Sequence, residues 1–320
     1  MIIERNEAWG IISYDTQNHE FACKYSPHKT QQPYVSNPLV LNCYLTHECN
    51  MRCDHCVAKD MQTFSSEDLI ITNDLIDKIN ASPFLVIVIS GGEPLLPHKS
   101  EDLVKLILGI EGKGIIVDTN GTNMLDKYLL QLLKEKNVLL RVSLDSVRPG
   151  SEICLRKIRG NKKRNEEIYF QKLNNIKSFV RDGVKVAAQS VLHKQNTLDI
   201  HHLPEKLQTW NIRLWFVQRL IPTVNMTEST YYTLDRDVYE ALAHSLPNTS
   251  SKFNVRCITK KDRRHNCVFL MVHDGKIYTS SDNSEERIYL GQLGEISDYF
   301  SFVSSSEHSA RYYSNDSLTE

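Results

Sequence analysis

Short apolar runs alternate with amphipathic stretches through the middle of the chain. Helical spacing of apolar positions is found at 66–80, 101–112, 124–136, 162–182 and 198–210. The continuous apolar runs, which predict buried strands, are 39–45, 84–89, 114–118, 138–144, 184–192 and 213–221. Strands that are apolar on both faces and are separated by helices are typical of a parallel sheet covered by helices. The pattern therefore predicts an α/β core.

Both ends of the chain follow a different pattern. Near the N-terminus, residues 9–15 and 20–25 flank a polar turn and predict a β-hairpin. After Pro222 we expect one helix at 235–242. The short strands expected beyond that helix are 253–258, 267–272 and 276–279. The sequence thus predicts a small N-terminal segment before the core and a small α+β extension after it.

Composition and charge exclude several classes of function. With 320 residues and a hydrophobic content of 41%, the chain can hold one barrel-sized domain and a small appendage. The formal net charge is -1, so no bulk field attracts nucleic acid or a membrane, and we expect neither as a partner. No run approaches a membrane span, and the N-terminus lacks the apolar region of a signal peptide. Eight cysteines in such a chain indicate a reducing compartment and metal ligation, so we predict a cytoplasmic location.

Three cysteines spaced C-x3-C-x2-C directly follow the first predicted core strand. Cys49, Cys53 and Cys56 therefore lie on a loop at the carboxyl end of a strand, where α/β folds place their chemistry. Three thiolates on one loop can bind three irons of a cubane cluster and leave the fourth iron open. The alternative is zinc with His47 or His55 as a fourth ligand, although zinc more often takes paired C-x2-C ligands. The polar residues between the cysteines disfavour buried structural thiols.

A second motif lies downstream, where Ser90-Gly91-Gly92-Glu93-Pro94 follows the apolar run at 84–89. Together the two motifs resemble those of the radical S-adenosylmethionine (SAM) superfamily, and the resemblance covers about residues 38–222. It implies a partial (β/α)6 TIM-type barrel with one [4Fe-4S] cluster held by Cys49, Cys53 and Cys56. It also implies an electron donor such as flavodoxin or ferredoxin. The electron would cleave SAM reductively to a 5′-deoxyadenosyl radical that abstracts a substrate hydrogen.

The resemblance also implies SAM-binding residues near these two motifs. In the family a GGE(P) turn binds the amino group of SAM, and here that turn is Gly91, Gly92 and Glu93. Glycine would let the backbone approach SAM closely. His55 occupies a place where the family usually has an aromatic residue that touches the adenine. A hydrogen bond that stabilises the cysteine loop is the alternative role for His55.

Three further segments match patterns of the family. Asn120 belongs to a TNG segment after the third predicted strand. Ser143 and Asp145 belong to an SLD segment, which would lie near the SAM ribose or carboxylate. Arg159, in Ile158-Arg159-Gly160, resembles an arginine that often pairs with the SAM carboxylate, as bidentate geometry favours. Arg156 is a rival for that role, and a solvated surface arginine is the alternative for both.

The C-terminal segment resembles a reduced SPASM or Twitch extension, a module that many peptide-modifying radical SAM enzymes use for auxiliary clusters. The resemblance lies in 274–278, which includes a hairpin turn signal, and in 290–294. Ser280 stands where that family has a ligand cysteine, and Cys257 and Cys267 supply two ligands at most. We therefore expect no auxiliary cluster in this extension.

The predicted organisation has four parts. An N-terminal hairpin and linker at 1–37 precede the core barrel at 38–222. The C-terminal extension at 223–302 is followed by a polar tail at 303–320, which we expect to be flexible.

Three hypotheses about the function follow. The SPASM-like hairpin favours a radical SAM enzyme that modifies a peptide or protein side chain. The loss of auxiliary ligands keeps a viperin-like enzyme acting on a nucleotide as the alternative. A non-catalytic SAM-binding iron–sulfur protein is the third hypothesis. Cys154, Cys257 and Cys267 are candidates for returning a hydrogen atom to a substrate radical, with burial as small apolar side chains as the alternative.

Overall fold

The structure is a computed structural model that describes most of the chain. The described residues are 1–26, 35–58, 67–158, 160–223, 226, 229–247, 253–257, 269–273, 275–279 and 289–296. Several sequence predictions fall outside this part of the chain, namely those for the linker at 27–34, Arg159, Cys267, Ser280 and the tail at 303–320.

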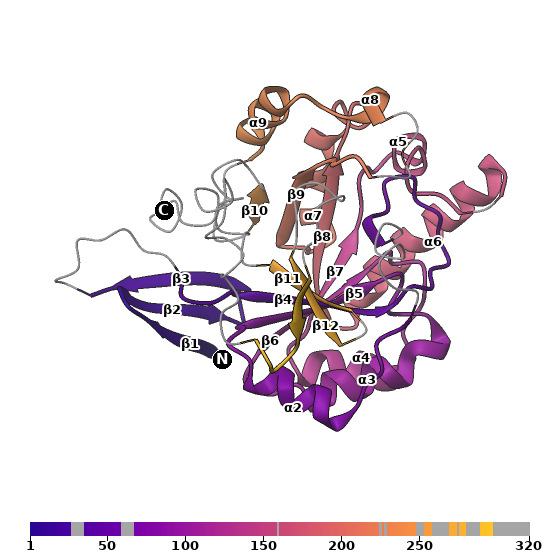
Figure 1. The fold of residues 1–320 in the computed structure, drawn as a ribbon. Helices are drawn as coiled ribbons and strands as arrows, with labels where there is room; N and C mark the ends of the chain where they lie inside the picture. Colours follow the sequence, from indigo (N-terminus) through magenta and orange to yellow (C-terminus); the bar gives the residue numbers. More distant parts are fainter. Residues whose placement is uncertain are drawn as a thin grey trace.

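The N-terminal residues form a separate three-stranded antiparallel sheet. Its strands pair in the order β1 (Ile2–Glu7), β2 (Gly10–Asp15) and β3 (Glu20–Tyr25). The predicted hairpin is confirmed as β2 and β3, which pair from Gly10 with Tyr25 to Asp15 with Glu20. The strand β1 was not predicted, because its first two residues are both apolar and no side chain of the strand is fully buried. In Figure 1 this sheet lies at one side of the large sheet, away from α6 (Lys162–Arg181).

The predicted core is confirmed as an α/β fold. Its six predicted strands are β4 (Val40–Thr46), β5 (Val86–Gly91), β6 (Gly114–Thr119), β7 (Leu139–Ser143), β8 (Lys185–Leu192) and β9 (Leu214–Arg219). Each pairs with the next in parallel. Parallel order places all carboxyl ends, and the loops that follow them, at one edge of the sheet.

Strands from the C-terminal segment extend this sheet on both sides. Next to β9, β10 (Asn254–Cys257) pairs in parallel. Next to β4, β11 (Phe269–His273) also pairs in parallel, and β12 (Lys276–Thr279) and β13 (Tyr289–Gln292) continue antiparallel. Within the described residues the result is one sheet of ten strands that ends at β10 and β13.

Helices follow most core strands. Besides α6, they are α2 (Asn73–Ala81), α3 (Ser100–Gly109), α4 (Lys127–Glu135), α5 (Pro149–Ile153), α7 (Leu203–Thr209), α8 (Ser229–Tyr232) and α9 (Arg236–Ser245), with short 3₁₀ helices at Pro97–Lys99 and Ile200–His202. The predicted start of the first helix at 66 was wrong. The side chain of Thr72 accepts a hydrogen bond from the amide of Leu75 and so begins α2 at Asn73. No helix among the described residues is long and apolar enough to cross a bilayer.

The two faces of the large sheet bury different partners. The outer face, with Leu41, Ile87 and Val117, packs against the helices in the main core. The inner face is defined here as the opposite one. At its lower end, near the amino ends of the strands, a second core joins strand residues such as Val86 to Trp9 and Tyr14 of the N-terminal segment. The N-terminal sheet therefore covers the end of the strands opposite the cysteine loop.

Candidate functional site

The cysteine loop is held in place by contacts with the segment that follows α5. The amide of Arg52 donates to the carbonyl of Lys157 at 2.6 Å, and the amide of Asp54 donates to the carbonyl of Leu155 at 2.9 Å. An ion pair of 2.7 Å between Asp54 and Lys157 adds to these bonds. Cys49 is exposed, whereas Cys53 and Cys56 are half-buried. The three thiols thus sit on a loop fixed at the carboxyl edge of the sheet.

The surroundings of the thiols bear on which metal group fits. Burial raises the pKa of Cys53 to about 11, although the nearby Arg156 guanidinium opposes this rise. A bound cation would favour the thiolate form at this position. Among the residues that the structure describes, no three His, Cys, Asp or Glu side chains converge closely enough for a single metal ion. A cubane cluster takes each thiolate on a different iron, so three thiols on one loop match three of its corners and leave the fourth iron open.

The two glycines of the GGEP turn lie against the start of the cysteine loop. The amide of Gly92 donates to the carbonyl of Thr46 at 2.6 Å. A Cβ atom on Gly92 would come within 2.0 Å of the carbonyl oxygen of Glu48. Gly91 has a φ of 121°, which disfavours other residues. The close approach of the GGEP turn to the start of the cysteine loop therefore requires glycine at both positions. The sequence analysis did not give this packing reason for the two glycines.

Glu93 ties the GGEP turn to the TNG segment. Its carboxylate is fully buried and accepts hydrogen bonds from the Thr119 hydroxyl at 2.7 Å, the Asn120 amide at 2.7 Å and the Leu95 amide at 3.0 Å. Burial raises the pKa of Glu93 to about 7, despite these three donors. In this structure the carboxylate positions neighbouring backbone, and its predicted contact with SAM stays a prediction.

Asn120 joins the TNG segment to the cysteine loop. Its Nδ2 donates to Oδ1 of Asn50 at 2.8 Å and lies 3.8 Å from Sγ of Cys49. Its Oδ1 accepts from the amide and the hydroxyl of Thr122, at 2.9 and 2.7 Å. The structure thus brings Asn120 and Glu93 together with the cysteine loop, and the predicted contact of Asn120 with the cofactor stays a prediction.

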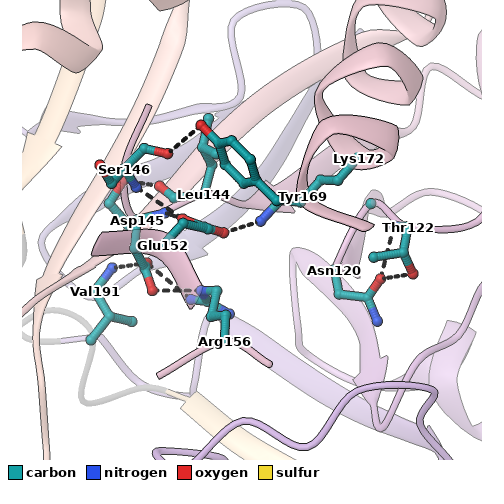
Figure 2. A network of polar contacts seen from close by, with 12 residues as sticks. Asn120, Thr122, Leu144, Asp145, Ser146, Glu152, Arg156, Tyr169, Lys172 and Val191 are labelled. Atoms are coloured by element: carbon teal, nitrogen blue, oxygen red, sulfur yellow. Dashed lines mark hydrogen bonds and ion pairs between the residues drawn. The ribbon is translucent and has the colours of Figure 1, made fainter. Parts of the chain in front are cut away.

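Asp145 and Arg156 form a buried ion pair near the same loop (Figure 2). Arg156 Nε lies 2.5 Å from Oδ2 of Asp145, and Arg156 Nη2 lies 3.1 Å from Oδ1. The amide of Val191 also donates to Oδ1, at 2.8 Å. Burial alone would raise the pKa of Asp145, but the Arg156 charge, the influence of His55 and His193 and the Arg156 hydrogen bond together outweigh it and hold that pKa at about 2. Arg156 is therefore engaged with Asp145, and Ser143 lies half-buried at the end of β7.

His55 and Cys154 flank this ion pair. His55 is 8% exposed and acts electrostatically on Asp145. The thiol of Cys154 donates to the carbonyl of Ser151 at 2.9 Å and lies 3.9 Å from Nε2 of the fully buried His193. Both side chains are thus near the cysteine loop, although their predicted roles toward SAM and substrate are untested.

Sequence reasoning missed a second buried ion pair, between Glu152 and Lys172. Glu152 accepts hydrogen bonds from the amides of Asp145 at 2.7 Å and Ser146 at 2.9 Å, and pairs with Nζ of Lys172 (Figure 2). Both charged side chains are only 2–3% exposed. The available signal was that Lys172 shares the apolar face of α6 with Tyr169, three residues earlier. This pair fixes the turn that carries Asp145.

The comparison with protein-family models gives one match. Residues 43–204 match the model described as the Radical SAM superfamily. The chain belongs to the radical SAM superfamily. Members of this superfamily are enzymes that use a [4Fe-4S] cluster and SAM, in agreement with the predicted cofactors.

Individual relatives match only part of this radical SAM chain. Fe-coproporphyrin III synthase of Methanosarcina barkeri is 31% identical over 161 residues, which are 49% of this chain and 37% of that protein. GTP 3',8-cyclase of Synechocystis is 30% identical over 185 residues, 54% of this chain and 52% of that protein. The chain thus aligns with about a third to a half of these curated relatives.

Solved structures support the fold. Streptococcus suis SuiB bound to precursor peptide SuiA has a TM-score of 0.64 at 15% identity, and the match covers 86% of this chain and 81% of that chain. At this identity the likeness concerns the fold alone.

Proposed function

We propose that this chain is a radical SAM enzyme that cleaves SAM reductively and abstracts a hydrogen atom from a peptide or protein side chain. The observation that carries the chemistry is the convergence on one loop of three motifs. The GGEP turn bonds to the start of the cysteine loop, and Asn120 bonds to Asn50 within it. Three cysteines without the neighbouring GGEP turn and Asn120 would be equally compatible with a structural metal site.

In this proposal Cys49, Cys53 and Cys56 hold the cluster, which together with SAM supplies the electron and the abstracting radical. The chain's own residues position that chemistry. Gly91 and Gly92 pack against the start of the cysteine loop, and the buried pair of Asp145 with Arg156 lies near Cys53. We assign SAM contacts to these two places, with Ser143, His55 and Arg159 as further candidates.

The peptide substrate is supported by the likeness to SuiB bound to its precursor peptide, which extends over 86% of this chain and so beyond the core barrel. The relationship to GTP 3',8-cyclase supports a nucleotide as the second candidate. A SPASM-like extension at 223–302, the cytoplasmic location and a flavodoxin or ferredoxin donor remain predictions.

The test is release of 5′-deoxyadenosine by the anaerobically reconstituted and reduced protein. The Cys53→Ala variant should lose iron and activity. The matched control is Cys23→Ala, in β3 of the N-terminal sheet, and it should keep both. Each protein is assayed alone, with a nucleoside triphosphate mixture, and with short peptides encoded beside the gene.

Stimulation by one peptide, with deuterium transfer from that peptide into 5′-deoxyadenosine, would support the proposal. Stimulation by a nucleotide alone would replace the peptide by the second candidate. No release in any sample that retains an intact cluster and binds SAM would favour the non-catalytic hypothesis.

A further inference from the structure

The inner face of the sheet changes from apolar to polar along the strands. At the amino ends it carries Val86, Leu139, Ala187 and Leu214, which pack against the N-terminal segment. Beginning level with Ala187 and Leu214 and continuing toward the carboxyl ends, the same face also carries polar and charged residues. They are Asp118, Arg141, Ser143, Gln189 and Arg256, and the aromatic Phe216 lies among them. A buried face that served only packing would continue apolar, so this change needs a reason.

Arg141 is the central residue of this polar layer. Its Nε and Nη2 donate to the two carboxylate oxygens of Asp118, at 2.7 and 2.8 Å. Its guanidinium carbon lies 5.1 Å from the centre of the Phe216 ring. Two contacts of different kinds thus fix the plane of the guanidinium, which lowers the entropy cost of binding a further group.

One edge of this fixed guanidinium makes no hydrogen bond to an acceptor among the described residues. Within the part of the chain that the structure describes, Nη1 of Arg141 makes no hydrogen bond. The side chains of Arg141 and Asp118 remain 16% and 29% exposed, so the pair is not sealed into the core. A fixed guanidinium edge that is open and largely desolvated favours a carboxylate or phosphate oxygen.

A second guanidinium adds positive charge to the layer. Arg256 lies 5.4 Å from the same Phe216 ring. It is anchored at the N-terminal sheet, where it donates to the carbonyl of His19 and pairs with Glu20 at 3.1 Å. Because its partners are His19 in the turn before β3 and Glu20 at the start of β3, Arg256 links the N-terminal sheet to this polar layer. Arg141 is therefore the residue left to contact a ligand.

We propose that the inner face binds an anionic group of the substrate, a carboxylate or a phosphate, on the Nη1 edge of Arg141. This inference rests on the proposed function, since it takes the cysteine-loop edge of the sheet as the place of reaction. Arg141 is the middle residue of β7, whose carboxyl end leads to the turn that carries Asp145. The substrate would therefore carry its anionic group nearer the amino ends of the strands than its reacting atom.

Two probes distinguish the sources of such a group. Inorganic pyrophosphate represents a nucleotide, and N-acetyl-glutamate amide represents an acidic peptide residue. Binding of each to the full, reconstituted protein is measured by titration calorimetry up to about 10 mM, within the range of weak fragments. We expect one probe to bind, and Arg141→Gln to weaken that binding by about tenfold or more, because a charge-assisted bond is lost. The matched control is Arg213→Gln, an exposed arginine directly before β9, which should bind as the unaltered protein does.

Arg141→Gln leaves Asp118 without its partner, so Arg141→Lys is made as well. Lysine keeps the charge but loses the planar fork, and we expect intermediate affinity with normal folding by circular dichroism. Binding of neither probe to the unaltered protein, or equal binding by a folded Arg141 variant, would overturn the inference. The titration involves no turnover, so its failure is separate from failure of the 5′-deoxyadenosine assay.

Discussion

The buried pair of Lys172 and Glu152 gives the sharpest test of how the site is supported. Lys172→Met keeps a long side chain on the apolar face of α6 but removes the ammonium group. Breaking a buried ion pair by removing one partner costs about 3–5 kcal/mol. Glu152 would still accept the amides of Asp145 and Ser146, at 2.7 and 2.9 Å, so part of its charge stays compensated. We therefore expect the lower end, about 3 kcal/mol.

The free energy of unfolding is measured by urea denaturation. With a slope of about 3 kcal/mol per molar for a chain of this size, the midpoint should fall by about 1 M. The matched control is Lys163→Met, an exposed lysine on the first turn of the same helix, for which we expect a change below about 0.5 kcal/mol. If the two variants lost the same free energy, the ion pair would not stabilise the turn that carries Asp145.

Two further predictions concern the glycine turn and the N-terminal sheet. Gly92→Ala should destabilise the protein and lower its iron content, because the new Cβ would meet the Glu48 carbonyl oxygen at 2.0 Å; Gly150→Ala in α5, with open space around it, should do neither. Burial, with the nearby positive charge of Lys185, lowers the pKa of His19 from 6.5 to about 3. Because the unfolded chain binds a proton first, stability should fall as the pH drops from 6.5 toward 3. His19→Asn, which tolerates the φ of 54°, should flatten this slope in denaturation curves; an unchanged slope would contradict this explanation.

The sequence predicted the core strands because parallel strands buried on both faces are continuous apolar runs. It could not predict β1, whose residues alternate only between exposed and half-buried, nor the start of α2, which depends on the single cap at Thr72. The cysteines and the GGEP turn are contiguous motifs and were found at once. The pair of Glu152 with Lys172 joins side chains 20 residues apart, and no local pattern specifies that contact.

The lack of a local pattern for contacts distant in sequence also explains why the polar residues of the inner face were not predicted to interact. Arg141 interrupts the apolar run at 138–144, whereas Asp118 only ends the run at 114–118. The parallel register, which sets Asp118 beside Arg141, is what joins the two residues in one bidentate pair. Chemistry that depends on strand register is therefore visible in the structure and not in the chain read linearly.

The pairing of β11 with β4 has a consequence for how the protein is made. Phe269 pairs with Val40, so the first core strand acquires its second neighbour 229 residues later in synthesis. Until then one side of β4, directly before the cysteine loop, presents unpaired backbone groups to the surroundings. At about 5–20 residues per second, that interval lasts roughly 10–45 seconds on the ribosome. The strand that leads into the cysteine loop is thus among the last core strands to gain both neighbours, and until then its open edge needs protection from edge-to-edge association.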